Sequence, residues 1–271
     1  MTRSLSSSSE LAGGKLRIDA PAPHVTRLTI HNPAKRNALD HEILDAIAAA
    51  VRKLEARCLL ITADGPVFSA GYDIGGLPRD EFAHRAESLV AHPFHNAIEA
   101  LDAFPLPAVA ALNGHAIGGG LELALTCDLR IAAAGAKLGM PPAKLGLVYS
   151  HTGLRKFLDA IGAARTRDLF YTGRNVSAAT ALEWGMVNEV VEDTELAERA
   201  VAYAAAIAAN APLSLEGNKR VLRELLAAEG RVDPETEREL VALREACFRS
   251  EDFYEGVHAF AEKRPPQWEG R

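Results

Sequence analysis

The sequence lacks a long apolar run, paired cysteines and any excess of basic residues. None of its apolar stretches reaches the ~18 residues that a membrane helix needs, and the N-terminus lacks the apolar centre of a signal peptide. Cys58, Cys127 and Cys247 are few, odd in number and far apart, so no CxxC pair indicates zinc or dithiol chemistry. The formal net charge of −6 disfavours nucleic acid as a partner. We therefore expect a cytoplasmic protein with reduced cysteines, no bound metal and no membrane partner.

What the sequence does contain is enough apolar material for a sizeable core. Hydrophobic residues make up 48% and charged residues 24% of the 271 residues, which is typical of a globular protein. The composition changes twice along the chain. We expect a disordered, Ser- and Gly-rich tail over residues 1–14, a core over 15–193 and a helical C-terminal region over 194–271.

Within the core, short apolar runs alternate with segments of helical periodicity. Strands are predicted at 15–19, 25–30, 58–63, 107–112, 128–132 and 187–191. Strand, crossover and strand in succession favour an α/β fold with parallel pairing. After residue 193 the pattern is helical only, at 195–210, 213–229 and 234–249. The charged residues of these helices are predicted to be their water-facing sides.

The stretch 107–132, PAVAALNGHAIGGGLELALTCDLRIA, combines two features that work against stability. Three glycines open a helix, at a cost of about 1 kcal/mol each relative to alanine. Glu122 places a carboxylate inside an apolar run, where an unpaired charge is costly. Glycines allow close approach to the backbone, and the free N–H groups of a helix N-terminus favour negative charge. The stretch therefore predicts either an oxyanion site beside a carboxylate, or a tight packing turn with a solvated glutamate.

Four motifs in order resemble the crotonase superfamily, the enoyl-CoA hydratase/isomerase fold. They are NPAKRNAL at 32–39, FSAGYDI at 68–74, the stretch 107–132, and FYTGRNVSAATALEWGMVNEVV at 170–191. The resemblance implies an α/β spiral of ββα units followed by a helical trimerisation region. It also implies a homotrimer or a dimer of trimers, and a coenzyme A thioester substrate. No further cofactor is implied, because coenzyme A is part of the substrate.

The resemblance also implies roles for individual residues. By motif match, the backbone N–H groups of Ala70 and Gly119 would hold the thioester oxyanion. Phe260 and Lys263 would reach the CoA bound to a neighbouring subunit. The expected CoA-binding residues are Ala38, Asp73, Ile74, Phe260 and Lys263.

The sequence departs from the hydratases of this superfamily at one decisive position. Those enzymes place a water molecule between two glutamates. Glu122 matches the first, but Pro142 stands where the second is expected, and proline can neither accept nor donate a proton. Tyr149, with the segment 250–265, resembles the methylmalonyl-CoA decarboxylases of the superfamily. Tyr72 replaces the histidine of that branch, and either hydrogen-bonds a substrate carboxylate or fills the pocket.

Three catalytic candidates follow: Glu122, Tyr149 and Tyr72. A second carboxylate beside a malonyl-type substrate would repel the substrate's own carboxylate, and Pro142 avoids that conflict. We therefore expect a lyase that decarboxylates a malonyl-type, methylmalonyl-like acyl-CoA. Two alternatives stay open: hydration or isomerisation of an enoyl-CoA, and a non-catalytic acyl-CoA-binding protein.

Overall fold

Two sheets organise the protein in a computed structural model that describes residues 9–73, 90–229 and 233–269. The larger sheet has seven strands in the order β1 (Ser9–Leu11), β2 (Leu16–Ala22), β3 (Val25–Ile30), β4 (Cys58–Ala63), β6 (Ala108–Leu112), β8 (Leu129–Ala133) and β11 (Glu189–Val191). The smaller has four, in the order β10 (Asn175–Ser177), β9 (Lys137–Gly139), β7 (His115–Ile117) and β5 (Val67–Ser69). Pairing is parallel from β3 to β11 and from β5 to β9.

The chain moves between the two sheets at each turn of a spiral. Strands β4, β6 and β8 of the larger sheet are each followed by a strand of the smaller one, β5, β7 and β9. The helices that follow these pairs are α3 (His95–Ala103), α4 (Gly119–Thr126) and α5 (His151–Thr172). This is the predicted spiral of ββα units. The smaller sheet was not predicted, because three-residue strands are too short to show a periodic pattern.

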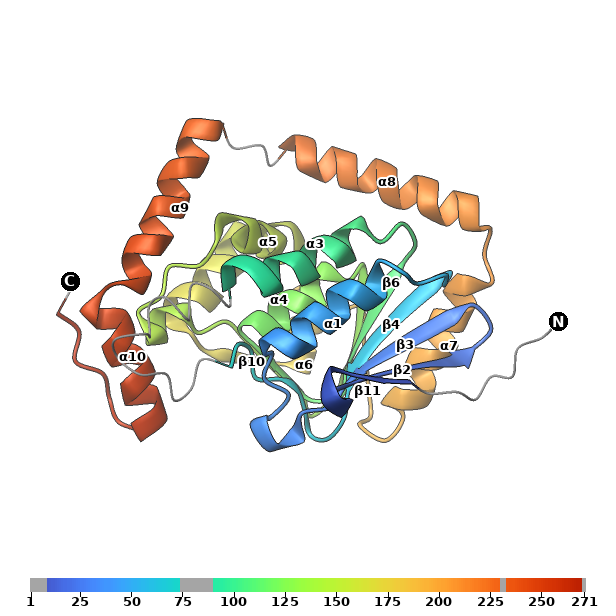
Figure 1. Cartoon of the computed structure of the whole chain (residues 1–271), viewed down its shortest axis with the longest axis horizontal. Coiled ribbons are helices and arrows are strands. Elements are labelled where there is room, and N and C mark those ends of the chain that lie inside the picture. The colour runs from blue at the N-terminus through green and yellow to red at the C-terminus, as the bar shows by residue number, and fades with distance from the viewer. Residues whose placement is uncertain (1–8, 74–89, 230–232, 270–271) are drawn as a thin grey trace.

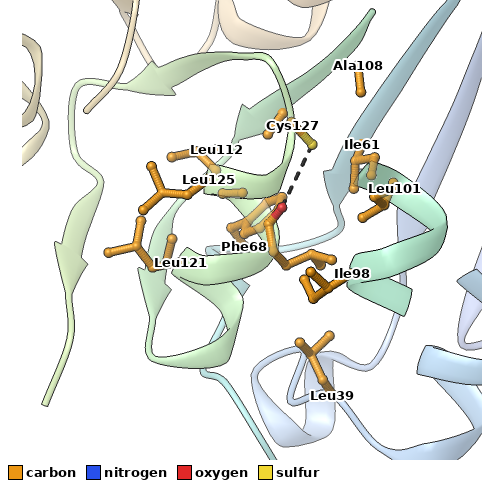
Figure 2. Close-up of a cluster of buried hydrophobic side chains, with 14 of the residues drawn as sticks. Leu39, Ile61, Phe68, Ile98, Leu101, Ala108, Leu112, Leu121, Leu125 and Cys127 are labelled. Carbon is orange, nitrogen blue, oxygen red and sulfur yellow. Dashed lines mark hydrogen bonds between the residues drawn. The ribbon is translucent and has the colours of Figure 1, made fainter. Parts of the chain in front are cut away.

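The larger sheet is buried on both faces, as its continuous apolar strands require. Alternate side chains of β6 point to opposite faces: Leu112 belongs to one apolar cluster and Val109 to the other. The first cluster lies under α3 and α4, where Figure 2 shows Leu112, Leu121, Leu101 and Phe68. A dashed line in that view marks the contact from the Cys127 thiol to a backbone carbonyl of α4.

The second cluster is covered by α7 (Leu196–Ala208), which contributes Leu196 and Ala204 (Figure 1). Helix α7 follows the predicted boundary at residue 193, yet it packs on the main sheet. Helix α7 belongs to the folded core, because without it the apolar outer face of β4, β6 and β8 would be exposed to water.

Local signals account for most element boundaries. The Asp40 carboxylate caps α1 (His41–Val51) by accepting from the Ile43 N–H at 3.0 Å, as its position before the apolar helix predicts. Helix α5 is interrupted at Gly162, whose backbone is not helical, so two helical segments meet there. The expected disordered tail is wrong for residues 9–14, because β1 pairs with β2 and a 3-10 turn follows it.

Three C-terminal helices lie at the periphery of the molecule (Figure 1). They are α8 (Pro212–Glu229), α9 (Pro234–Phe248) and α10 (Glu251–Glu262), and the last of these was not predicted as a helix. Ser250 caps α10 by accepting from the Phe253 N–H. Among the described residues, no helix has the length and apolar character needed to cross a bilayer.

Lys219 joins α8 to the core, although its helix was predicted to place its charged residues in water. Its side chain is only 8% exposed, and its ammonium lies 2.8 Å from Asp128 Oδ2 and 2.9 Å from Leu106 O. The same Asp128 oxygen accepts from the Ala108 N–H at 2.7 Å. A single lysine therefore satisfies acceptors at the start of β6 and the start of β8.

Replacing Lys219 with Met is expected to lower the free energy of unfolding by about 1–3 kcal/mol, because the Leu106 carbonyl and the Asp128 carboxylate, 32% exposed, lose their charged hydrogen-bond donor. Urea unfolding monitored by circular dichroism measures this loss. Lys53→Met is the control, since Lys53 is exposed just after α1. An unchanged urea midpoint in Lys219→Met would show that α8 is not held by this contact.

Candidate active site

The backbone at the candidate site is fixed by a buried asparagine. Asn37 is 1% exposed, and its side-chain amide donates to Asp64 O and Val67 O at 2.8 and 2.6 Å. The Ser69 hydroxyl donates to Asn37 O and accepts from the Gly71 N–H. These bonds attach the NPAKRNAL loop to β5 and hold the FSAGYDI segment that follows it.

Two glycine-containing segments meet at the N-terminus of α4. A Cβ on Gly71 would lie 2.9 Å from Ile117 O and 3.3 Å from Gly119 N. A Cβ on Gly119 would lie 2.6 Å from Cε1 of Tyr72. Real Cβ atoms do not approach this closely, so glycine is required at both positions. These glycines therefore allow two segments of the chain to pack closely, whereas the approach of a substrate to the same backbone stays a prediction.

At this meeting point two backbone N–H groups have no acceptor among the described residues. They are those of Gly119 and Tyr72, and not that of the predicted Ala70. The Ala70 N–H donates to Arg36 O at 3.0 Å and is therefore already used. Tyr72 forms a parallel bridge with Leu39. In this bridge the Leu39 N–H donates to Gly71 O, and the Asp73 N–H donates to Leu39 O. The Tyr72 N–H lies between these two bonds and points away from Leu39. No described residue accepts from the N–H of Tyr72 or of Gly119. The Ala70 N–H is therefore unavailable as the predicted donor, and the N–H group left beside that of Gly119 belongs to Tyr72.

The three predicted catalytic side chains are brought together. Glu122 lies in the first turn of α4 and is only 4% exposed. The Tyr149 hydroxyl donates a short hydrogen bond to Glu122 Oε2. The Tyr72 hydroxyl lies 3.4 Å from that of Tyr149, within reach of a weak hydrogen bond. A carboxyl and two phenols therefore form one chain across the site.

Burial sets the protonation of this chain. Desolvation raises the pKa of Glu122 to about 7, against the Tyr149 hydrogen bond and the charge of Lys156, which both lower it. Burial and the nearby Glu122 charge raise the pKa values of Tyr72 and Tyr149 well above 10. At neutral pH the two phenols are therefore neutral donors, whereas Glu122 exists in both of its protonation states.

Gly153 supports this arrangement and was not singled out by the sequence. A Cβ there would lie 2.6 Å from Cε1 of Tyr149 and 2.9 Å from Glu122 Oε1. The first turn of α5 therefore packs directly on the hydrogen-bonded pair. A glycine three residues after the Ser150 cap, inside a helix that it weakens, was the available signal.

Pro142 is buried at the start of a 3-10 turn, Pro142–Leu145. Its side chain can neither donate nor accept a proton. Among the described residues, the polar side chain in contact with Glu122 is Tyr149 and not a second carboxylate. The sequence prediction of an incomplete glutamate pair agrees with this arrangement. The side chain that hydrogen-bonds the Glu122 carboxylate is thus a tyrosine hydroxyl.

The predicted CoA-binding residues are only partly placed. Ala38 is buried in the loop beside β5, and the Asp73 carboxylate pairs with Lys35 Nζ at 2.6 Å. Ile74 lies outside the described residues. Phe260, 66% exposed on α10, and Lys263, the left-handed residue that ends α10, are not brought to Glu122 in this chain. Their contact with a neighbouring subunit's CoA stays a prediction.

Comparison with known proteins gives one consistent family. Residues 22–271 match the enoyl-CoA hydratase/isomerase family. A probable enoyl-CoA hydratase of Bacillus subtilis is 38% identical, over 91% of this chain and 95% of the relative. The 2,3-dehydroadipyl-CoA hydratase of Escherichia coli is 30% identical, over 91% and 96%. A solved structure of methylmalonyl-CoA decarboxylase in complex with 2-nitronate-propionyl-CoA is 29% identical, with a TM-score of 0.85 and coverage of 95% and 99%. The chain belongs to the crotonase (enoyl-CoA hydratase/isomerase) superfamily.

Proposed function

We propose that this protein is an acyl-CoA lyase that decarboxylates a malonyl-type thioester through a thioester enolate. The observation that carries the proposal is the bond from the Tyr149 hydroxyl to Glu122. A hydratase needs a pair of carboxylates to hold and activate water. Here Glu122 is the one glutamate that matches the hydratase pattern, and the Tyr149 hydroxyl is bonded to one of its two carboxylate oxygens. The likeness to methylmalonyl-CoA decarboxylase supports the same reaction class.

The oxyanion would be held by the free N–H groups of Tyr72 and Gly119. The N-terminus of α4 adds its partial positive charge at the same point. When the bond between the α-carbon and the carboxylate breaks, CO2 leaves and its bonding electrons move into the thioester to form the enolate. Two preorganised donors stabilise that charge in a way that water cannot match.

Glu122 then has a role that its raised pKa permits. In its protonated form it does not repel the substrate carboxylate, and it can deliver a proton toward the α-carbon directly or through Tyr149. The enolate becomes a saturated thioester, and Glu122 regains its proton from solvent. Every atom is accounted for without another cofactor.

The CoA moiety is assigned to the loop and helix residues of the family pattern. Ala38, Asp73 and Ile74 would contact it within one subunit, and Phe260 and Lys263 would reach it from a neighbour. A homotrimer, or a dimer of trimers, is supported by apolar side chains exposed on α8: Leu213, Val221, Leu222, Leu225 and Leu226. We infer a cytoplasmic location for the assembly.

Incubation with methylmalonyl-CoA and, separately, with crotonyl-CoA tests the proposed reaction. We expect CO2 and propionyl-CoA from the first and no hydration of the second, both followed by liquid chromatography and mass spectrometry. Hydration of crotonyl-CoA without CO2 release from malonyl- or methylmalonyl-CoA would instead favour the enoyl-CoA hydratase that several relatives are named for. Tight acyl-CoA binding without any turnover would favour a non-catalytic acyl-CoA-binding protein.

A further inference from the structure

Helix α9 lies against the loop that carries Tyr149, and two contacts fix it there. The Val148 N–H lies 3.3 Å from the Cys247 sulfur, and the Cys247 thiol donates to Gly146 O at 2.8 Å. About three turns earlier on α9, Glu237 Oε1 lies 3.4 Å from His151 Nε2. One side of α9 therefore faces the segment 146–151 at both of its ends.

Arg244 lies on that same side of α9. It follows Glu237 by seven residues and precedes Cys247 by three, and these spacings place side chains on one helical face. Its side chain is half-buried, and its Nε atom is buried with no hydrogen-bond partner among the residues that the structure describes. A charged donor without an acceptor in such a position is costly unless a ligand supplies one.

The contacts of α9 bring Arg244 near the loop that carries Tyr149, and its electrostatic effect agrees with that placement. Its charge acts on the pKa of the Tyr72 hydroxyl, in the downward direction and against desolvation. The charges that act on the Glu122 pKa are instead those of Lys156 and Asp102. Arg244 stands between Glu237 and Cys247 on α9, and these two residues contact the segment 146–151, so its side chain faces the loop that carries Tyr149.

We propose that Arg244 is a specificity residue whose guanidinium binds a carboxylate on the acyl group of the CoA thioester. The inference rests on the proposed function only in requiring an acyl-CoA at this site, and it holds whichever reaction follows. Guanidinium and carboxylate form two parallel hydrogen bonds, and such a pair gains strength where water is excluded. The carboxylate belongs either to the α-carbon, as in malonyl-type thioesters, or to the far end of a longer acyl chain.

Binding of matched saturated thioesters tests this role without turnover. Isothermal titration would compare glutaryl-CoA with valeryl-CoA, which differ by one terminal carboxylate against a methyl group. In Arg244→Met we expect the affinity for glutaryl-CoA to fall about 10- to 100-fold, which is the typical loss when a hydrogen bond between charged groups is removed. The affinity for valeryl-CoA should stay within about twofold of the wild-type value. A parallel rise in KM for malonyl-CoA, with glutaryl-CoA unaffected, would place the carboxylate on the α-carbon and equally support the assignment.

Two variants make the result specific. Arg238→Met removes an exposed arginine of the same helix and should change neither affinity. Arg244→Lys keeps the charge but loses the paired geometry, so it should recover only part of the preference. Equal weakening of glutaryl-, malonyl- and valeryl-CoA in Arg244→Met would reveal a structural role in holding α9 and overturn the proposal. If Arg244→Met changed neither the affinity for glutaryl-CoA nor the KM for malonyl-CoA, the proposal would be overturned while acyl-CoA binding stayed intact. A wild-type protein that binds no acyl-CoA would overturn the proposed function as well.

Discussion

Tyr149→Phe is expected to lower kcat by about 10²–10⁴-fold, the range for loss of a positioned proton-transfer group. It should also move the alkaline limb of the pH–rate profile to higher pH. The phenol donates a hydrogen bond to the Glu122 carboxylate and so favours its charged form, which lowers the Glu122 pKa toward about 7. Without that bond, desolvation raises the pKa of Glu122 further, because one of the interactions that lower this pKa is lost.

The sign of the pH effect follows from the proposed role of Glu122 as proton donor. The active form is the protonated one, so the wild-type rate should fall as the pH rises through about 7. Glu122→Gln cannot titrate and should lose this limb together with most of the rate. Measuring kcat from pH 5.5 to 9 for the wild type and both variants gives the comparison.

Tyr171→Phe is the matched control for the first variant, because Tyr171 is 76% exposed on α5 and lies outside the site. It should retain the wild-type rate and profile. A rate that rises through pH 7 in the wild type would mean that Glu122 acts as a base, which contradicts the proposed proton delivery. An unshifted limb in Tyr149→Phe would show that the phenol does not set the Glu122 pKa.

Gly119→Ala is expected to reduce kcat by about 10²–10³-fold, the cost of losing one oxyanion donor. The added Cβ would stand 2.6 Å from Cε1 of Tyr72, so the ring or the α4 N-terminus must shift. Either shift separates the two N–H groups that would hold the thioester oxygen. Affinity for free coenzyme A, which lacks the acyl carbonyl, should change far less, and parallel titrations can measure this.

Gly217→Ala provides the control for the glycine change. A Cβ on Gly217 would meet no atom within 4 Å, and alanine favours the α8 helix. It should keep full activity and the same assembly state by light scattering. If Gly119→Ala were as active as Gly217→Ala, the oxyanion assignment at Gly119 would be wrong.

Much of the main sheet could be predicted because its strands carry strong local signals. The run 58–63 is nearly all apolar and the run 25–30 is rich in β-branched residues, and they appear with the predicted bounds as β4 and β3. Capping residues such as Asp40 and Ser177 bond an N–H within one turn of their helix, so each is a local signal that the sequence carries. The smaller sheet escaped prediction because its three-residue strands are specified by pairing with distant segments.

The errors at the site share one cause, which is that direction and distance are tertiary properties. The FSAGYDI motif indicated a backbone donor, but only the bridge to Leu39 showed that the Tyr72 N–H is free and the Ala70 N–H is used. The helical pattern of 195–249 predicted that the charged residues of these helices face water. It could not show that Lys219 is buried or that Arg244 faces the segment before α5.

The sequence by itself determined the family, the glycine-rich turn at α4 and the absence of a second glutamate at Pro142, because each depends on residue identity in a local motif. Only the tertiary structure decided what replaces that glutamate. Tyr149 is 27 residues from Glu122 along the chain, yet folding removes both from water and joins them in one hydrogen bond. That burial, and not the residue types alone, raises the Glu122 pKa to about 7 and gives the carboxyl a proton to deliver.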